Sequence, residues 1–297
     1  MDILKKIVLI IPYRGIGDLI FHLPLIRGLS KKYQQKIILI TNINNKAEYI
    51  LNSEKSVSKI FFSDFTRENL IKNSMKLLTK LNNLKPDLIV VTAPSKRLKI
   101  PLYLSKSKMR VIFKKSNIKD LSQYIFSQSK LSFKNIKFKK DYKFKFQSQK
   151  SNKKSIFLSL DSFHDQNNWS ELNFIRLIEK ILLKKRLYKI YINFAPSKVS
   201  KFKKILNQFN RHSNITFTYS MKFSSIMKIL YNIKYVIGNE SGPACLGAAM
   251  GKKVFSIYNP IHTPNLSSKI INKDIIYFNS KKVSPIKIIN KILVRIN

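Results

Sequence analysis

The chain reads VIGNESGPACLGAAMG at residues 236–251, and this stretch says most about its fold. The apolar residues at its start, with Tyr235 before them, predict a short buried strand. A polar turn follows. Ser241-Gly242-Pro243 then predicts the start of a helix, because serine is a common N-cap and proline is tolerated in a first helical turn. The helix also carries a face of small residues that can pack closely on a sheet: Ala244, Gly247, Ala248 and Gly251.

The start of this helix is a candidate anion site. Its first N–H groups have no partner within the helix, and the helix dipole places positive charge at the same end, so a phosphate is favoured there. Gly242 lets the backbone approach a ligand closely. An ordinary strand–turn–helix of an α/β domain has the same pattern, and these residues alone leave both interpretations open.

Strand and helix patterns alternate in both halves of the chain, which is typical of parallel sheets covered on both faces. Strands are expected at residues 7–11, 36–41, 57–62, 87–92, 109–113, 155–160, 188–194, 215–218, 235–237, 254–258 and 275–278. Helices are expected at residues 18–32, 46–52, 67–82, 170–185, 200–209 and 223–231, then from Ser241 and from Ser284-Pro285. Pro24 is expected to kink the first helix.

The sequence therefore predicts two Rossmann-like domains, residues 1–150 and 151–297, with a cleft between them. Packing of the last helix back onto the first domain is left open. The pattern fails over residues 133–154, where Lys, Phe, Gln, Ser and Asn mix without a clear period. A linker or a lysine-rich edge strand is expected there, and the alternation of Tyr142, Phe144 and Phe146 favours a strand. Contact of these aromatic residues with single-stranded nucleic acid is the weaker alternative.

Composition indicates a polyanionic partner. The 297 residues include 57 Lys and Arg against 15 Asp and Glu, a formal net charge of +42. Nucleic acid, anionic lipid and phosphorylated glycolipid would all be attracted to such a surface. A lone cysteine, Cys245, excludes an intrachain disulfide and a cysteine-based zinc site. No run approaches the ~20 apolar residues that span a bilayer, so we expect a cytoplasmic protein, held by charge at the inner face of the membrane.

A second motif, PYRGIGD at residues 12–18, follows the first expected strand. Glycine-rich turns at this place in a parallel sheet are common ligand sites. Ile20 stands where a dinucleotide fingerprint has its third glycine. Asp18 is either a helix-capping carboxylate or a general base. His22 follows one turn later and could orient Asp18 or contact a substrate, although a packing histidine is the more ordinary interpretation.

Several other chemistries are excluded by pattern. Ala248 stands where a Walker loop would need lysine. The chain has no Asp-x-Asp pair, no histidine pair at zinc spacing and no Gly-x-Ser-x-Gly elbow. Positive charge and helix N-termini are thus the expected means of neutralising a phosphate, and we expect neither a metal nor a bound cofactor.

Taken together, the motifs resemble glycosyltransferase family 9, the heptosyltransferase-like enzymes. The resemblance covers roughly residues 7–30 and 155–260. It rests on three segments: GIGD at 15–18 with Leu23-Pro24, NNWSE at 167–171, and YVIGNESGP at 235–243 with GKKV at 251–254.

The resemblance implies a GT-B fold and an inverting, metal-independent transfer from a nucleotide-diphosphate sugar to a lipopolysaccharide-type or other glycolipid acceptor. Asp18 would deprotonate the acceptor hydroxyl, and Arg14, Gly15, Gly17 and His22 would form the acceptor loop. The N–H groups at the start of the late helix would hold the leaving diphosphate. The implied donor-binding residues are Ser162, Asn167, Glu240, Ser241, Gly242 and Pro243.

The chain departs from the family pattern at four positions. The family often has Lys or Arg where Asn167 stands, Pro at Ser170, Asp at Glu240, and His at Cys245. Two of these changes remove groups expected to meet the diphosphate. Three interpretations are open: a donor other than ADP-heptose, substitution by another cation such as Arg14, or weak activity. A nucleic-acid-binding Rossmann protein and a family member without catalysis remain the alternatives.

Overall fold

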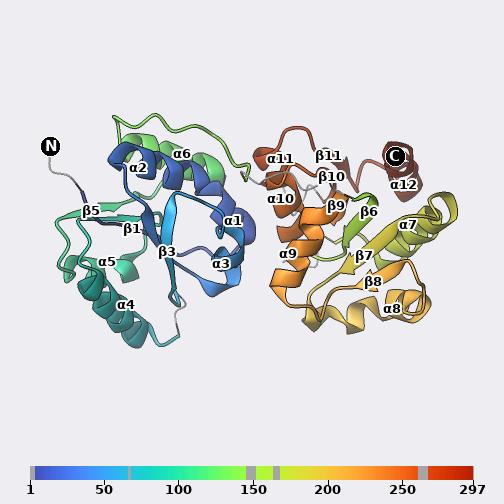
Figure 1. Cartoon of the computed structure of the whole chain (residues 1–297), viewed down its shortest axis with the longest axis horizontal. Helices are drawn as coiled ribbons and strands as arrows, with labels where there is room; N and C mark the ends of the chain where they lie inside the picture. Colours follow the sequence, from blue (N-terminus) through green and yellow to red (C-terminus); the bar gives the residue numbers. More distant parts are fainter. Residues whose placement is uncertain (1–3, 66–67, 145–151, 163–167, 260–266, 297) are drawn as a thin grey trace. The chain divides into compact units, whose positions relative to one another are not determined.

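The computed structural model describes residues 4–65, 68–144, 152–162, 168–259 and 267–296. The chain divides into two compact units, Met1–Tyr142 and Lys143–Asn297. Each contains one parallel sheet with helices on both faces, so the predicted fold class is confirmed (Figure 1).

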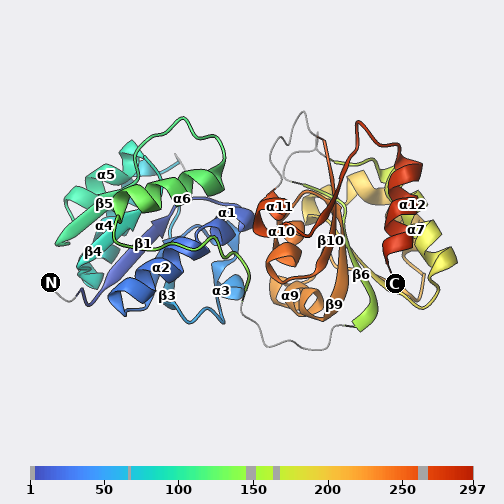
Figure 2. The ribbon, with the colours of Figure 1, turned by 90° about the horizontal axis from the view of Figure 1, so that it is seen from above.

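The N-terminal unit has a five-stranded parallel sheet in the order β3-β2-β1-β4-β5. Its strands are β1 Ile7–Ile11, β2 Ile37–Thr41, β3 Val57–Phe62, β4 Leu88–Val91 and β5 Met109–Ile112. Its helices are α1 Ile16–Phe21, α2 Leu23–Tyr33, α3 Ala47–Ile50, α4 Leu70–Leu84, α5 Lys96–Tyr103 and α6 Leu121–Ser132, with a 3-10 turn at Ile43–Asn45. Helices α1, α2 and α6 cover one face, and α4 and α5 cover the other (Figure 2). All five residues of β1 are buried, as expected for a central parallel strand.

The helix expected at residues 18–32 is interrupted. It ends at Phe21, His22 lies between the two parts, and α2 resumes with Pro24 in its first turn, where the missing N–H costs least. The predicted kink is therefore a break. Three of the described helices were not predicted: α5, which contains Pro101, α6, in which Ser and Gln dilute the apolar period, and the short α11 of the C-terminal unit, Ser267–Ile271.

The linker or edge strand expected from residue 133 onward is not a strand over residues 133–144. Phe133, Phe138 and Tyr142 are instead buried. A Cβ on Gly28 of α2 would lie 2.5 Å from the Phe138 ring, and Tyr142 packs edge-on against Phe21. These three aromatic residues belong to the N-terminal core. Their positions in the sequence therefore reflect packing in that core and not the alternation of a strand. Phe146 lies outside the described residues.

The C-terminal unit has a six-stranded parallel sheet in the order β11-β10-β9-β6-β7-β8. Its strands are β6 Asn152–Ser159, β7 Lys189–Asn193, β8 Ile215–Phe217, β9 Ile233–Asn239, β10 Lys253–Tyr258 and β11 Ile276–Asn279. Its helices are α7 Glu171–Lys184, α8 Lys203–Phe209, α9 Phe223–Asn232, α10 Gly242–Ala249, α11 Ser267–Ile271 and α12 Pro285–Arg295, with 3-10 turns at Pro196–Lys198 and Ser200–Phe202. Helices α7, α8 and α12 lie on one face and α9, α10 and α11 on the other (Figures 1 and 2).

Two expectations concern helix packing in this unit. A Cβ on Gly247 would lie 2.7 Å from Cγ2 of Val236, so the small face of α10 does bring that helix close to β9. The last helix, α12, packs its apolar side within the C-terminal unit. Ile288, Ile289 and Ile292 are buried in the C-terminal core, because α12 packs against α7.

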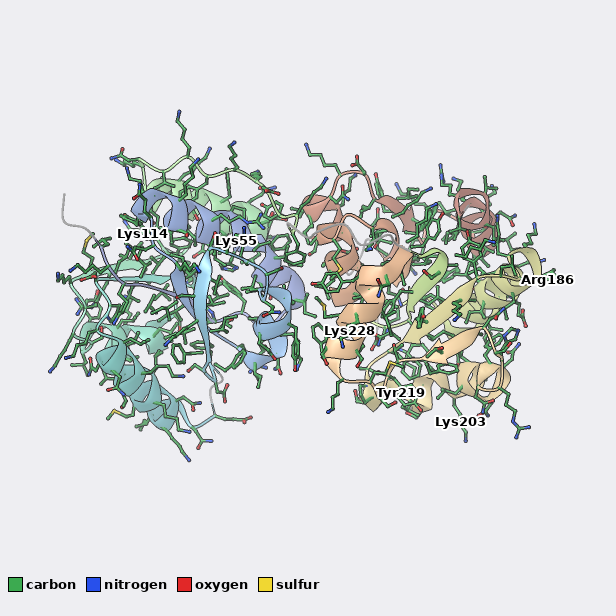
Figure 3. The ribbon with its side chains drawn as sticks, viewed as in Figure 1. Lys55, Lys114, Arg186, Lys203, Tyr219 and Lys228 are labelled. Carbon is green, nitrogen blue, oxygen red and sulfur yellow. The ribbon has the colours of Figure 1, made fainter. Side chains whose placement is uncertain are left out.

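Basic side chains cover much of the surface, as the net charge requires. Lys55, Lys114, Arg186, Lys203 and Lys228 are all exposed (Figure 3). Among the described helices, none is long and apolar enough to cross a bilayer.

Candidate functional site

Asp18 lies in the loop-to-helix turn that follows β1. It is the third residue of α1, and its Oδ2 accepts a hydrogen bond from the N–H of Gly15 at 2.9 Å. This hydrogen bond is the one expected of a helix-capping carboxylate, so Asp18 does cap α1. Only one carboxylate oxygen is used, however, and Oδ1 has no hydrogen-bond partner among the residues that the structure describes. A carboxylate held by one oxygen can still accept a proton on the other.

The surroundings of Asp18 make its carboxylate more basic. Burial raises its pKa above the ordinary value, and the hydrogen bond from Gly15 opposes this only in part. A side chain at residue 15 would crowd this carboxylate, because a Cβ on Gly15 would lie 2.7 Å from Oδ2 of Asp18. Arg14 and Gly15 are exposed, and Gly17 is half-buried at the second position of α1. The loop therefore presents a partly desolvated carboxylate next to accessible backbone, an arrangement suited to a general base.

His22 is completely buried and does not contact the Asp18 carboxylate. Its Nδ1 donates to the backbone carbonyl of Asp18 at 2.6 Å, since a carbonyl can only accept. Its Nε2 lies 2.9 Å from Oγ1 of Thr92 at the end of β4. Burial lowers the pKa of His22 to about 4, so the ring is neutral and Nε2 accepts the Thr92 hydroxyl proton. The packing interpretation holds: His22 ties the start of α1 to β4.

Acidification should therefore expose the role of His22. Its pKa is below the 6.5 of an unfolded chain, so the folded state resists protonation and its stabilisation is lost as pH falls from 6.5 towards 4. We expect this one group to lower the free energy of unfolding by up to about 3 kcal/mol over that range. Urea unfolding at pH 7, 5.5 and 4.5 measures the fall, which should be shallower in His22→Gln. Identical slopes in the two proteins would show that His22 titrates normally.

Two cavities open at the carboxyl ends of the N-terminal strands. One, of about 220 Å³, is lined by Pro12 and Tyr13 after β1, by Ala93 after β4, and by residues of α4 and α5. The other, of about 480 Å³, is lined by Arg14 together with residues 42–44 and 62–64. Tyr13, whose hydroxyl donates to the Thr92 carbonyl, was not predicted as a site residue. Ligands of open α/β sheets bind at this edge. Of the predicted site residues, Arg14 lines one of these cavities, and the unpredicted Tyr13 lines the other.

The start of α10 carries unused donors at the corresponding edge of the C-terminal sheet. Ser241 is the N-cap, but its side chain makes no capping bond and pairs with Oγ of Ser159 at 2.9 Å. The N–H groups of Ser241, Gly242 and Ala244 accordingly have no acceptor within the described part of the chain. Pro243 has no N–H and cannot hold an anion through its backbone, which corrects its predicted role. Three such amides and the dipole of an eight-residue helix are suited to an anion.

A buried amide network fixes the loops around this helix start. Asn168 Oδ1 accepts from both the N–H and the hydroxyl of Ser162, at 2.7 and 2.9 Å. Asn239, at the end of β9, accepts from the N–H of Trp169 at 2.8 Å and donates to the Leu160 carbonyl. Ser162 is thus brought to the same sheet edge as Ser241 and Gly242. The sequence did not single out Asn168 or Asn239, although each directly precedes a residue that it did.

The Glu240 carboxylate is held by hydrogen bonds from two other elements of the C-terminal unit. Its carboxylate accepts from the Ser256 hydroxyl and from the N–H and hydroxyl of Ser268, the last two at 2.7 and 2.6 Å. It therefore joins β10 to the first turn of α11, where a negative charge is favoured. A donor that bound to this carboxylate would compete for oxygens that already accept three hydrogen bonds. Asn167 lies outside the described residues.

Comparisons with known proteins bear directly on this arrangement. The family model of glycosyltransferase family 9 (heptosyltransferase) matches residues 109–291, well over half of the chain. The chain belongs to glycosyltransferase family 9. A search of curated proteins finds no match.

Solved structures of this fold include family 9 enzymes. A glycosyl transferase family 9 protein from Veillonella parvula has a TM-score of 0.74 at 13% identity, covering 100% of this chain and 91% of the other. ADP-heptose LPS heptosyltransferase II of E. coli reaches 0.76 at 13% identity, with 98% and 99% covered. E. coli heptosyltransferase WaaC with ADP reaches 0.73 at 12% identity, with 99% and 100% covered. At such identities the likeness concerns the fold.

Two further features of this glycosyltransferase concern charge at the helix start. Cys245, which stands where the family often has histidine, is buried on α10 and brings no charge there. Burial raises the pKa of Asp161, which precedes Ser162, while an N–H bond from Ala195 and the charges of Lys198 and Lys201 oppose the rise. The two lysines follow β7 and bring positive charge to this edge.

Among the described residues, no group of three or more His, Cys, Asp or Glu side chains is arranged to hold a metal.

Proposed function

We propose that this glycosyltransferase moves a sugar from a nucleotide-diphosphate donor to a lipopolysaccharide-type or other glycolipid acceptor, with inversion and without a metal. The observation that carries the proposal is the start of α10, where three backbone N–H groups lack an acceptor in the described chain. A departing diphosphate supplies the negative oxygens that such donors stabilise. Similar structures are described as WaaC with ADP and with ADP-2-deoxy-2-fluoro heptose, which supports a nucleotide-sugar donor.

In the proposed reaction, the acceptor hydroxyl gives its proton to Asp18 as its oxygen attacks the anomeric carbon. The bond from that carbon to the diphosphate breaks, and the pair of electrons leaves with the diphosphate. The amides of Ser241, Gly242 and Ala244 hold this group, with Lys198 and Lys201 as the nearby cations. We propose that Ser162 contributes its hydroxyl at the phosphates. Heptose is the sugar that the family suggests. Because the Glu240 carboxylate already accepts three hydrogen bonds within the protein, we leave a different sugar open.

A donor screen tests the proposal. The purified protein is incubated with ADP, UDP and GDP and with their sugars, first for shifts in the unfolding temperature and then for release of the nucleoside diphosphate. We expect one nucleotide to raise the unfolding temperature, its sugar to be turned over, and the rate to be unchanged by EDTA. Binding without turnover of any sugar would favour the inactive family member. Loss of turnover in EDTA would contradict the metal-independent mechanism.

Affinity for nucleic acid separates this proposal from its main alternative. Oligonucleotides will bind a chain of +42 charge at low salt, and this binding should weaken steeply as salt rises. Sub-micromolar binding that persists at physiological salt, with no donor turnover, would favour the nucleic-acid-binding alternative.

A further inference from the structure

We infer that the outer side of α4 and α5 is a membrane-docking surface that inserts apolar side chains into a bilayer of anionic lipid. The inference concerns residues outside the candidate site and does not rest on the proposed chemistry. We define the α4–α5 face by its exposed apolar and basic residues: Ile71, Met75, Ile100, Tyr103, Leu104, Lys72, Lys76 and Lys99.

The apolar side chains of this face are strongly exposed. Ile71 is 81% exposed, Tyr103 67%, Ile100 66%, Leu104 63% and Met75 57%. The helices that carry them pack side by side on one face of the N-terminal sheet, anchored through Leu77, Leu81, Leu98 and Leu102 in the core. Their other sides therefore point away from the sheet together (Figures 1 and 2). Large apolar groups gathered on one side of a domain are typical of a binding surface.

A groove on this side adds to the apolar area. It has a volume of about 670 Å³ and runs along α4 beside the edge strand β3. Phe61 and Leu84 line it with Met75, and the lysines at 72, 76 and 80 line it as well. An acyl chain or an apolar side chain fits such a lining, and the ammonium groups meet phosphate at the same depth.

Charge determines which partner fits. Residues 88–119 contain nine Lys or Arg and no Asp or Glu, and residues 70–86 contain four Lys and no acid. An anionic lipid surface attracts such a segment by about 1 kcal/mol for each nearby cation. Nucleic acid would also be attracted, but Tyr103 is the single aromatic residue of the α4–α5 face as defined, and its Ile, Met and Leu side chains offer bases no stacking partner and no hydrogen bond. Apolar residues between lysines match a bilayer, with its apolar interior under anionic headgroups.

The position of this face relative to the N-terminal cavity fits a lipid-linked substrate. The 220 Å³ cavity is lined by Asn73, Ser74 and Leu77 of α4 and by Leu98 of α5. The same helices thus contribute residues of their N-terminal halves to the cavity and their outer sides to the α4–α5 face. A protein docked through this face would hold the cavity close to the headgroup layer.

The test is co-sedimentation of the whole protein with vesicles of phosphatidylcholine, either alone or mixed with about one third of the anionic lipid phosphatidylglycerol. One variant carries Ile71→Ser, Met75→Ser, Tyr103→Ser and Leu104→Ser. Its matched control removes four similarly exposed apolar residues of the C-terminal unit, Leu183→Ser, Leu187→Ser, Ile286→Ser and Val294→Ser. We expect the first variant to bind anionic vesicles at least about tenfold more weakly than the control, because each lost apolar group removes buried area.

A second pair tests the charge. Lys72→Gln, Lys76→Gln and Lys99→Gln together should weaken binding to anionic vesicles by roughly 100-fold, and Lys180→Gln, Lys184→Gln and Lys203→Gln should weaken it far less. Unfolding temperature and donor turnover are measured in every variant and should be unchanged, so a failure of the proposed function would be seen separately. Equal losses in both lysine sets, or wild-type binding by the serine variant, would overturn the inference. So would loss of oligonucleotide binding in the serine variant with vesicle binding intact.

Discussion

Replacing Asp18 by asparagine is expected to lower the turnover number of sugar transfer by roughly 10²–10⁴-fold and to leave the fold intact. The amide oxygen of asparagine can still accept the N–H of Gly15, at a site where Oδ2 now lies 2.9 Å from that nitrogen. Asparagine cannot take a proton from the acceptor. The substitution therefore separates the two roles of this side chain, because it keeps the cap and removes the base. Steady-state rates with the donor found by screening measure the effect.

The pH dependence provides the matching signature. Burial raises the pKa of Asp18, so the wild-type rate should rise with pH as this carboxyl ionises, and the midpoint should lie above that of an ordinary Asp. Asp18→Asn should lack this limb. The same shift has an effect on stability with a definite sign: a raised folded-state pKa stabilises the protein at low pH, and this is lost as pH rises through it. At pH 7 the variant should thus be at least as stable as the wild type.

A full turnover number in Asp18→Asn would show that Asp18 acts only as a cap. A low rate accompanied by a lower unfolding temperature would instead attribute the loss to the fold. Thr92→Val serves as the control for indirect effects, since it removes the hydroxyl that meets His22 but leaves the carboxylate in place. Its rate should change much less than that of Asp18→Asn.

Local patterns in the sequence were enough to predict both sheets. The central strands β1 and β9 each contain a short apolar run that precedes a glycine and a helix start. β1 has its predicted bounds, and β9 extends two residues beyond the predicted strand at each end. Their burial follows from being flanked by strands on both sides. Helix α6 was missed for the opposite reason. It buries Tyr124 and Ile125 but also Ser122, Gln128 and Ser129, so its buried side has no apolar period to detect.

The contacts that shape the candidate site could not be predicted in the same way. Ser241 pairs with Ser159, which is 82 residues away, and Asn239 meets Trp169 across 70 residues. Such pairs form only because the strands that carry them are neighbours in the sheet, and the order of the strands cannot be predicted from the local pattern of one sequence. Glu240 is a similar case, because its serine partners lie on β10 and α11. The Asp18 contact was predictable since its partner is only three residues away.

Replacing Gly238 by alanine is expected to be the most destabilising single change considered for this protein. Gly238 has φ +151°, a conformation that favours glycine, and a Cβ would lie 2.0 Å from the carbonyl oxygen of Ser159. The carbonyl of Ser159 is backbone, the added Cβ is fixed to the backbone of residue 238, and the two residues are paired in β6 and β9, so neither group can rotate away. Strain at φ and forced separation of the strands should together cost more than about 4 kcal/mol. Urea unfolding measures the loss.

Gly251→Ala is the matched control for this change. Gly251 also has a positive φ, +69°, but a Cβ there meets no atom within 4 Å. It should cost about 1 kcal/mol, the conformational part alone. The difference between the two variants therefore isolates the contact between β6 and β9. If Gly238→Ala cost no more than Gly251→Ala, the strands would be free to separate. The ends of those strands lead to Ser162 and to Ser241, so such freedom would also mean that the anion site at α10 is not held rigidly by the sheet.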